Sequence, residues 1–227
     1  GGYDSFIEEF IPATLGLLDQ GYTLLFFEGD GQGKTLKYGL PLTYAWEEPT
    51  KCVLDYYQIN HCPMIGISWG GYFVMRAAAF EKRISAVVAY DVADDGLEIM
   101  TNVFPPILRR LIRWVFAHKQ EKLVNHLVRF AIHKSVLADW ALSQGQYITH
   151  TKSPYRFYQE VQKHTLRGVC DRITQDCLLL AGEKDHYIPI DQFERLQSSL
   201  PNGVYALKSN SAVEHFEFVV SDPALKW

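Results

Sequence analysis

Short apolar runs separated by turn residues dominate the hydrophobic pattern of this chain. Buried strands of a parallel sheet have this pattern, in runs of about four to eight residues bounded by residues such as Gly, Asp or Pro. The pattern predicts five strands, at 23–27, 63–67, 84–90, 177–181 and 203–207. Helical periodicity occurs between and before them, at 6–18, 48–57, 72–80 and 191–200. This alternation predicts an α/β fold with a mostly parallel sheet.

One long stretch, residues 92–172, interrupts the alternation. It shows helical periodicity and no convincing strand, with an irregular break near 144–154. The sequence therefore predicts residues 1–91 as the N-terminal part of the core, 92–172 as an inserted helical cap and 173–227 as the C-terminal part of the core.

The first part of this insertion is basic. Residues 105–134 carry seven Lys and Arg residues against one acid, Glu121, with apolar residues interleaved. This spacing predicts an amphipathic basic helix. A solvated face on a cap helix is the favoured interpretation, and contact with a membrane surface or an anionic substrate is the alternative.

The composition is that of an ordinary globular protein, with 227 residues, 48% of them hydrophobic, and a formal net charge of −4. This length suits one domain with an insertion, and the mild acidity does not favour nucleic acid as a partner. The four cysteines, Cys52, Cys62, Cys170 and Cys177, lack C-x-x-C spacing and are too few for a disulfide scaffold. No stretch approaches the roughly 20 apolar residues that span a bilayer. We expect a cytoplasmic protein without a metal.

The strongest local motif is Gly66-Ile67-Ser68-Trp69-Gly70, at the junction of a predicted strand and a predicted helix. In that context the G-x-S-x-G pattern places a serine on a tight turn with its hydroxyl exposed above the sheet, and the glycines let strand and helix approach closely. We expect Ser68 to be a nucleophile. The competing interpretation is a turn of small residues in any α/β protein.

A serine hydroxyl needs a general base, and the base needs an orienting acid. In this architecture the chain order is Ser, acid, His. Asp185 follows the predicted strand 177–181 and His215 follows the predicted strand 203–207, so both are expected at the same edge of the sheet as Ser68. Asp91 is the main rival acid, Glu183 and Asp191 are further candidates, and His186 is the rival base.

The oxyanion formed in acyl transfer needs preorganised backbone donors. The N–H of Trp69, directly after the nucleophile, is one candidate. The segment Gly1-Gly2-Tyr3-Asp4-Ser5 is typical of a loop that supplies the second, with Tyr3 favoured and Gly2 as the alternative. A loose glycine-rich terminus is the competing interpretation. The turn at 29–33 lacks the Lys and Ser/Thr of a phosphate-binding loop and is predicted to be a rim turn beside the site.

Five motifs together resemble the α/β-hydrolase superfamily. They are GGYDS at 1–5, EGDGQG at 28–33, GISWGG at 66–71, AGEKDH at 181–186 and EHF at 214–216. They are similar to the branch of acylaminoacyl-peptidase-like and prolyl-oligopeptidase-like proteins and pseudooxynicotine hydrolases. The resemblance implies an α/β-hydrolase fold with Ser68 as nucleophile, Asp185 as acid and His215 as base. It also implies that Tyr3 and Trp69 supply the oxyanion donors.

Two departures from the family pattern affect this expectation. Family members carry further strands before the Gly-Gly loop and a closing helix after the histidine, whereas this sequence begins at Gly1 and ends at Trp227. We therefore expect a catalytic domain that lacks N-terminal strands.

Together these patterns predict a serine hydrolase that cleaves a small ester, amide or ketone through an acyl-enzyme, without a cofactor. Aromatic residues of the insertion, among them Trp114, Trp140 and Tyr147, are expected to line a mostly apolar substrate pocket. The alternatives are a serine peptidase acting on short acylated peptides and a binding protein that keeps the fold without activity. The expected partner is a small molecule or short peptide, and a homodimer stays open.

Overall fold

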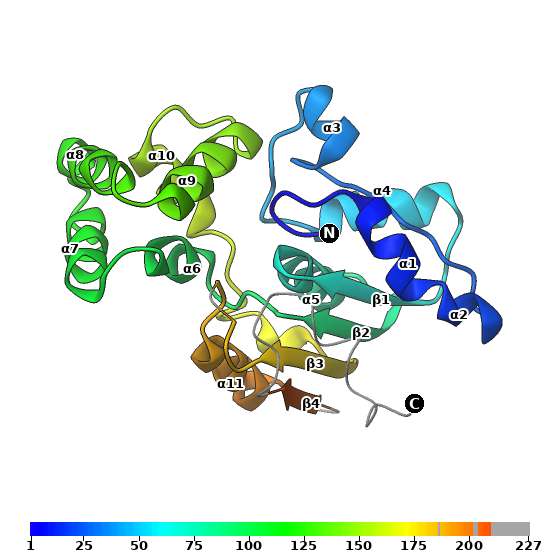
Figure 1. The fold of residues 1–227 in the computed structure, drawn as a ribbon. Coiled ribbons are helices and arrows are strands. Elements are labelled where there is room, and N and C mark those ends of the chain that lie inside the picture. The colour runs from blue at the N-terminus through cyan, green and yellow to red at the C-terminus, as the bar shows by residue number, and fades with distance from the viewer. Residues whose placement is uncertain (186, 202–203, 210–227) are drawn as a thin grey trace.

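Four parallel strands form the central sheet of the protein, seen in a computed structural model that describes residues 1–185, 187–201 and 204–209 (Figure 1). The strands are β1 (Cys62–Ile67), β2 (Ile84–Tyr90), β3 (Asp176–Gly182) and β4 (Val204–Ser209). They pair in the order β1-β2-β3-β4, every pair parallel. The carboxyl ends of all four strands therefore meet at one edge. The predicted strands at 63–67, 84–90 and 177–181 are confirmed, and β4 overlaps the prediction at 203–207.

The predicted strand at 23–27 is wrong. Residues 22–29 have no regular secondary structure, and no backbone hydrogen bond joins them to β1 within the described part of the chain. An apolar run becomes a strand only where a neighbouring strand takes up its N–H and C=O groups. Here Leu25 is exposed and Phe27 packs at the margin of the core, so the run makes apolar contacts without a ladder.

Three helices pack beside the sheet: α4 (Glu47–Tyr56), α5 (Trp69–Phe80) and α11 (Ile190–Ser199). α5 contacts β1 and β2, α4 packs on α5, and α11 contacts β3. α5 is almost wholly buried, which is why its sequence is apolar all round rather than amphipathic. These three helices confirm the periodicity predicted at 48–57, 72–80 and 191–200.

The N-terminal helix predicted at 6–18 is broken into short pieces. They are the 3-10 turn η1 (Ile7–Phe10), α1 (Ile11–Thr14) and α2 (Gly16–Asp19), and α3 (Gly33–Lys37) follows the turn at 29–33. Pro12 and Gly16 each sit near the start of a new piece, and both residue types disfavour a continuous helix. A further 3-10 turn, η2 (Cys170–Arg172), precedes β3.

Five helices lie between β2 and β3 and form a separate layer beside the sheet (Figure 1). They are α6 (Gly96–Asn102), α7 (Pro106–Ala117), α8 (Glu121–Ile132), α9 (Val136–Ile148) and α10 (Pro154–Val161), here called the helical segment. The irregular break lies after Ile148, because α9 continues through Gln144. The boundaries at 91/92 and 172/173 stay predictions.

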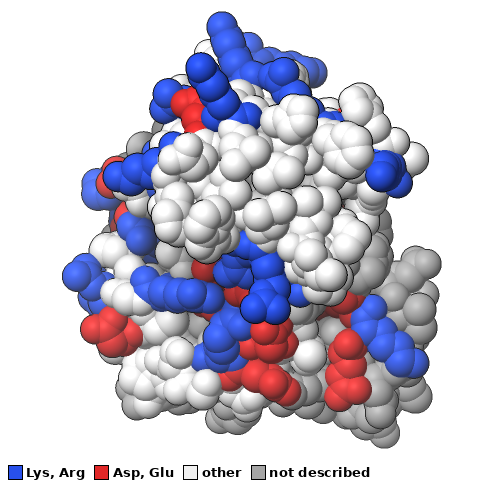
Figure 2. Space-filling model, turned by 90° about the vertical axis from the view of Figure 1, so that its left-hand side faces the viewer, with Lys and Arg blue, Asp and Glu red and all other residues white. Residues whose placement is uncertain are grey.

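The single basic helix expected at 105–134 is in fact two helices, α7 and α8. Lys119, with φ of +56°, turns the chain between them. Figure 2 shows the face on the side of α7 and α8, where Lys and Arg side chains lie around a broad uncharged area. Exposed apolar side chains of these helices include Ile107, Trp114 and Phe130. No helix in the described ranges combines the length and apolar character needed to cross a bilayer.

Both ends of the helical segment are tied to each other and to α11. The Gly96 N–H donates to the His164 carbonyl at 2.9 Å, and the Leu166 N–H donates to the Asp94 carbonyl at 3.0 Å. The buried Gln192 of α11 accepts the N–H of Asp94 with its side-chain oxygen at 2.9 Å. These hydrogen bonds, together with ion pairs of Arg195 with Asp94 and of Arg167 with Asp95, close the base of the segment beside the carboxyl end of β2.

β1 and α5 approach each other at a distance that leaves no room for a side chain. A Cβ on Gly66 would lie 2.0 Å from the Gly70 carbonyl oxygen and 2.8 Å from a methyl group of Val74. The tight crossing therefore depends on glycine at position 66.

We expect Gly66→Ala to lower the free energy of unfolding by about 1–3 kcal/mol, because the added methyl group forces β1 and α5 apart. Urea denaturation of the variant and the wild type measures the difference. Gly16→Ala is the control, since a Cβ there meets nothing within 4 Å. A Gly66→Ala protein as stable as the wild type would contradict the crossing described above.

His164 forms a buried polar contact with the first residue of α5. His164 is 2% exposed, and its ring Nδ1 accepts the indole N–H of Trp69 at 3.1 Å. The rings of Tyr72 and Phe73 also pack against it. Burial lowers the pKa of His164 to about 3, and the nearby charges of Lys163 and Arg76 act in the same direction. The imidazole is therefore neutral at neutral pH, as its acceptor role requires.

This burial predicts a loss of stability in acid. The pKa of His164 is about 3 when folded, against an ordinary 6.5, so between these values the unfolded chain binds the extra proton. Protonation of His164 in the unfolded chain therefore leaves the free energy of unfolding unchanged well above pH 6.5 and lowers it as the pH drops from there toward 3. From pH 7 to pH 5 the expected loss is about 2 kcal/mol.

His164→Asn keeps a hydrogen-bond acceptor but does not titrate in this range, so its stability should fall less over the same interval. Urea denaturation at both pH values gives the comparison, with the exposed His133→Asn as the matched control. An identical loss in His164→Asn and the wild type would exclude His164 as the source.

Candidate active site

Ser68 lies on the strained turn between β1 and α5. Its backbone has φ of +60° and ψ of −125°, a conformation that residues with a side chain rarely adopt. Two backbone hydrogen bonds hold it: the Ser68 N–H donates to the Tyr90 carbonyl, and the Ser68 carbonyl accepts from the Gly71 N–H, each at 2.8 Å. The strand–turn–helix context predicted for the G-x-S-x-G motif is confirmed.

The Gly1-to-Ser5 loop contacts this turn directly. A Cβ on Gly2 would lie 3.0 Å from the Cβ and 3.1 Å from the Oγ of Ser68. The Gly2 N–H donates to the Ser5 Oγ at 2.6 Å, so it is already engaged. By contrast, the Tyr3 N–H has no hydrogen-bond acceptor among the described residues. This favours Tyr3 over Gly2 as an oxyanion donor.

The second expected donor, the Trp69 N–H, is at the first position of α5. The first N–H groups of a helix have no intrahelical acceptor and point out of the helix start, where the helix dipole is positive. A Cβ on Gly2 would lie 3.4 Å from the Trp69 nitrogen. The loop and the helix start therefore lie together beside Ser68.

The side chain of Tyr3 connects this loop to the helical segment. Its hydroxyl donates to the Ala141 carbonyl of α9 at 2.6 Å, and its ring contacts the rings of Trp69 and Trp140 at 5.4 and 5.8 Å between centroids. Burial raises the pKa of Tyr3 well above its usual value, so the hydroxyl remains a donor. The Tyr3 carbonyl also accepts from the Gln144 amide at 3.2 Å. The glycine-rich segment is thus a packed loop.

The two leading acid candidates occupy different positions at the carboxyl edge. One oxygen of Asp185 accepts the N–H groups of Tyr187 and Ile188, at 2.7 and 3.1 Å, and so shapes the loop after β3. Asp91 is buried, and its Oδ1 accepts the Gly182 N–H at 3.3 Å between β2 and β3. Tyr187 and Ile188 line the same cleft as Ser68, which favours Asp185.

The other acid and base candidates are placed as follows. Asp191 lies on α11 and forms an exposed ion pair with Arg195 at 2.9 Å. Glu183 is exposed at the end of β3. His215 and its rival His186 lie outside the described residues, so the base stays a prediction.

A cleft of about 590 Å³ opens beside Ser68. Its lining comes from the N-terminal loop, the start of α5, the helical segment and the loop after β3. The lining residues are Gly2, Tyr3, Asp4, Ser5, Glu9, Ser68, Trp69, Ile99, Met100, Val103, Trp140, Ala141, Tyr187 and Ile188. The charged residues among them, Asp4 and Glu9, are both acids. This volume is typical of a site for a small organic molecule.

Of the three aromatic residues expected to bind substrate, Trp140 lines this cleft and Trp114 and Tyr147 do not. Trp114 is 59% exposed on α7, where it packs on His118, and Tyr147 is 60% exposed on α9. No residue of α7 lines the cleft, and Tyr147 lies about two helical turns from Trp140 along α9. For Trp114 and Tyr147 the expectation is therefore corrected.

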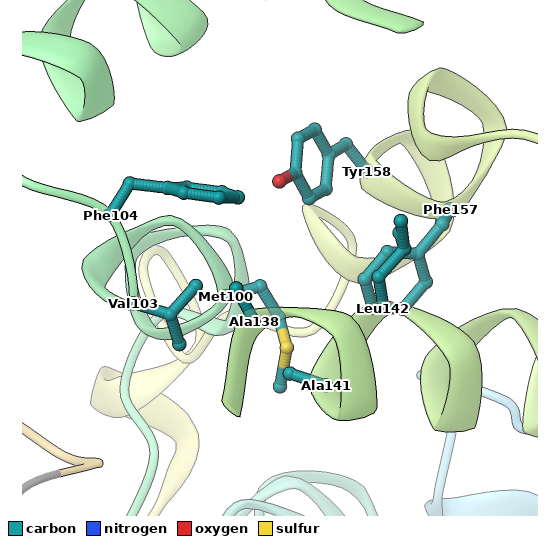
Figure 3. A pocket seen from close by; sticks show the side chains of 8 residues that line it. All are labelled: Met100, Val103, Phe104, Ala138, Ala141, Leu142, Phe157 and Tyr158. Atoms are coloured by element: carbon teal, nitrogen blue, oxygen red, sulfur yellow. The ribbon is translucent and has the colours of Figure 1, made fainter. Parts of the chain in front are cut away.

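A second, much smaller void lies inside the helical segment (Figure 3). Mostly apolar side chains from α6 and the two residues after it, from α9 and from α10 surround it, and its volume of about 10 Å³ admits no more than a water molecule. Met100, Val103 and Ala141 line both this void and the cleft. It is a packing gap behind the cleft wall.

Two residues that the sequence reasoning missed contact this site. His164 accepts from the Trp69 indole, and Gln32 donates to the N-terminal loop. Both are distant in sequence from their partners, and only the EGDGQG motif gave a signal for Gln32. No group of three or more His, Cys, Asp or Glu residues in the described ranges is arranged to bind a metal.

Comparison with known proteins agrees with this geometry. The sequence model of the alpha/beta hydrolase fold family matches residues 4–222. The hydrolyase ccsE of Aspergillus clavatus is 29% identical over 217 residues, which cover 86% of this chain and 49% of the relative. The 20-hydroxy-prefusarin hydrolase FUS2 of Gibberella moniliformis is 28% identical over 74% of this chain and 42% of its own length. The chain thus spans about half the length of the curated relatives it matches.

Solved structures share the architecture. The 2,6-dihydroxy-pseudo-oxynicotine hydrolase superposes with a TM-score of 0.71 at 18% identity, over 95% of this chain and 53% of that one. The esterase EaEST of Exiguobacterium antarcticum superposes with a TM-score of 0.59 at 16% identity, over 96% of this chain and 84% of that one. These similarities concern the fold. With the family match across almost all of the sequence, they lead to one assignment: this chain belongs to the α/β-hydrolase fold family.

Proposed function

We propose that this chain is the catalytic part of a serine hydrolase that acts on a small organic molecule through an acyl-enzyme. One observation carries the proposal. Ser68 lies on a strained strand-to-helix turn that opens into a cleft of about 590 Å³, and the N-terminal loop and the start of α5 lie against it. This is the arrangement that acyl transfer to a serine needs.

In the first step, His215 takes the proton of the Ser68 hydroxyl as the oxygen attacks the carbonyl carbon of the substrate. The N–H groups of Tyr3 and Trp69 stabilise the resulting oxyanion, and Asp185 orients the imidazole and stabilises its positive charge. The oxyanion collapses, the leaving group accepts the proton from His215, and an ester to Ser68 remains. His215 then deprotonates water, whose oxygen attacks the ester carbonyl. As the bond to Ser68 breaks, His215 returns this proton to the Ser68 oxygen and the acid is released.

The cleft favours a substrate that is small and largely apolar. Its walls include Ile99, Met100, Val103 and Trp140 from the helical segment and Ile188 from the loop after β3. Such walls exclude bulk water and bury an apolar ligand. The hydrolase names of the fungal relatives, among them a 20-hydroxy-prefusarin hydrolase, support a small-molecule substrate. The bond cleaved is an ester, an amide or a ketone carbon–carbon bond.

A fluorophosphonate probe should label Ser68, because it reacts with serines that a base activates. Mass spectrometry of the modified peptide identifies the site. Ser68→Ala should abolish labelling and His215→Ala should slow it at least about 10³-fold. Ser143→Ala, on the exposed face of α9, is the control and should label like the wild type. A folded wild-type chain without label at Ser68 would instead favour a binding protein that keeps the fold.

Replacing each candidate acid by the isosteric Asn decides whether Asp185 or Asp91 is the catalytic acid. We expect Asp185→Asn to lower kcat on p-nitrophenyl butyrate about 10³–10⁴-fold, because the histidine loses its orienting charge. Asp91→Asn should lower it less than about tenfold, since the amide oxygen still accepts the Gly182 N–H. Both variants keep their backbone contacts, so circular dichroism should match the wild type. A larger loss in Asp91→Asn would assign the acid role to Asp91.

A further inference from the structure

Gln32 is the residue of the turn at 29–33 whose side chain contacts the N-terminal loop. It is 6% exposed, and its amide nitrogen donates to the carbonyl oxygens of Gly1 and Gly2, both at 3.1 Å. Its amide oxygen accepts the Gly29 N–H at 3.2 Å. One buried side chain thus bonds two consecutive carbonyl groups of the loop that touches Ser68.

The turn that carries Gln32 is itself held in place. The Thr35 hydroxyl donates to the carbonyl groups of Gly29 and Gln32, the latter at 2.7 Å. The Gly31 N–H donates to the Leu40 carbonyl at 2.9 Å. The amide of Gln32 therefore projects from a fixed turn, and its position does not depend on a flexible backbone.

Because the peptide group is planar, the hydrogen bond from Gln32 to the Gly2 carbonyl also determines the direction of the Tyr3 N–H. In a trans peptide the C=O and the following N–H point to opposite sides of the chain. The Gly2 carbonyl points to Gln32, so the Tyr3 N–H must point away from Gln32. In the same way the Gly1 carbonyl bonds Gln32 while the Gly2 N–H bonds the Ser5 hydroxyl on the other side.

The side opposite Gln32 is the side of the site. Gly2 lies against the Cβ and Oγ of Ser68, and Gly2 and Tyr3 line the cleft together with Ser68 and Trp69. The Tyr3 N–H has no acceptor among the described residues, as expected for a donor kept for a substrate oxygen. A rotated Gly2–Tyr3 peptide would instead direct a carbonyl dipole toward that oxygen.

We propose that Gln32 is a positioning residue for the oxyanion hole: by donating to the Gly1 and Gly2 carbonyls it directs the Tyr3 N–H toward the substrate oxygen. This inference rests on the proposed function, because it assigns a task to Gln32 only if Ser68 performs acyl transfer. It also gives the EGDGQG turn a role that neither phosphate binding nor a simple rim turn supplies.

Gln32→Glu tests the proposal with a nearly isosteric change. The carboxylate keeps an acceptor for the Gly29 N–H but has no hydrogen to donate to the two carbonyl groups. We expect kcat on p-nitrophenyl butyrate, per active site titrated with a fluorophosphonate, to fall about 10–100-fold with KM changed less than about threefold. A loss confined to kcat is expected because the oxyanion donor acts mainly in the transition state.

A pH profile separates positioning from a general loss of structure. A carboxyl buried against two carbonyl oxygens has a raised pKa, and in its protonated form it donates one hydrogen bond. The ratio of the kcat of Gln32→Glu to that of the wild type should therefore rise several-fold from pH 8 to pH 5. Taking the ratio removes the protonation of His215, which both proteins share. Gln32→Met, without donor or charge, should lose kcat at every pH.

Gln175→Glu is the matched control. Gln175 is 8% exposed and donates to the Ala78 carbonyl at 2.9 Å, near the far end of α5 from Ser68. The same substitution there should lower stability while kcat per titrated site stays within about twofold of the wild type and its ratio stays flat with pH. If Gln32→Glu gives too little folded protein, Gln32→Met carries the kcat comparison.

The outcomes separate the two proposals. A wild type that neither labels at Ser68 nor hydrolyses the ester overturns the proposed function, and the role of Gln32 with it. An active wild type with a Gln32→Glu kcat within twofold of its own overturns the role of Gln32 alone. So does an equal loss of kcat in Gln175→Glu, or a loss without pH-dependent recovery, because each indicates a general structural effect.

Discussion

The site depends on the close approach of three backbone segments at Ser68. β1, the first turn of α5 and the N-terminal loop meet where side chains are excluded: a Cβ on Gly66 would lie 2.0 Å from the Gly70 carbonyl oxygen, and one on Gly70 would lie 2.6 Å from that of Gly1. Glycine at these positions lets the serine occupy a conformation with φ of +60°. The backbone of Ser68 keeps this strained conformation because the segments packed around it leave no room for a relaxed one.

Hydrogen bonds between uncharged groups hold the N-terminal loop and the first turn of α5 in this arrangement. Gln32 and Gln144 bond the loop and His164 bonds Trp69, each from a distant part of the chain. The hydroxyl of Tyr3 in turn donates from the loop to the Ala141 carbonyl. A buried polar group left without a partner costs about 1–3 kcal/mol, so each contact stabilises one arrangement against its competitors. Two of the contacts, those of Tyr3 with Ala141 and Gln144, join the loop to α9. The helical segment is therefore a structural part of the site.

The sequence predicted those features of the fold that depend on residues close together in the chain. Strand and helix periodicity identified four strands and the nucleophile turn, because burial on a sheet and the strand–glycine–serine–glycine–helix spacing are properties of neighbouring residues. The apolar run at 23–27 failed because a strand needs a partner, which no single segment reveals. The expectation for Trp114 and Tyr147 failed because periodicity does not reveal which helices, or which end of a helix, border the cleft. Gln32 and His164 act across long sequence separations, which periodicity cannot detect.

The position of the helical segment in the sheet order separates one wall of the cleft from the elements of the core. β2 and β3 pair directly, with Tyr90 opposite Leu180, although five helices separate them in sequence. The hydrogen bonds between the segment's two ends close it at the carboxyl edge, so its interior can change without altering the strand register. Ile99, Met100 and Val103 line the cleft from α6 and the residue after it. Ser68, by contrast, lies between β1 and α5, and the loop beside it comprises residues 1–5. The wall of the cleft formed by the helical segment and the backbone around Ser68 are therefore separate in sequence and are joined through Tyr3.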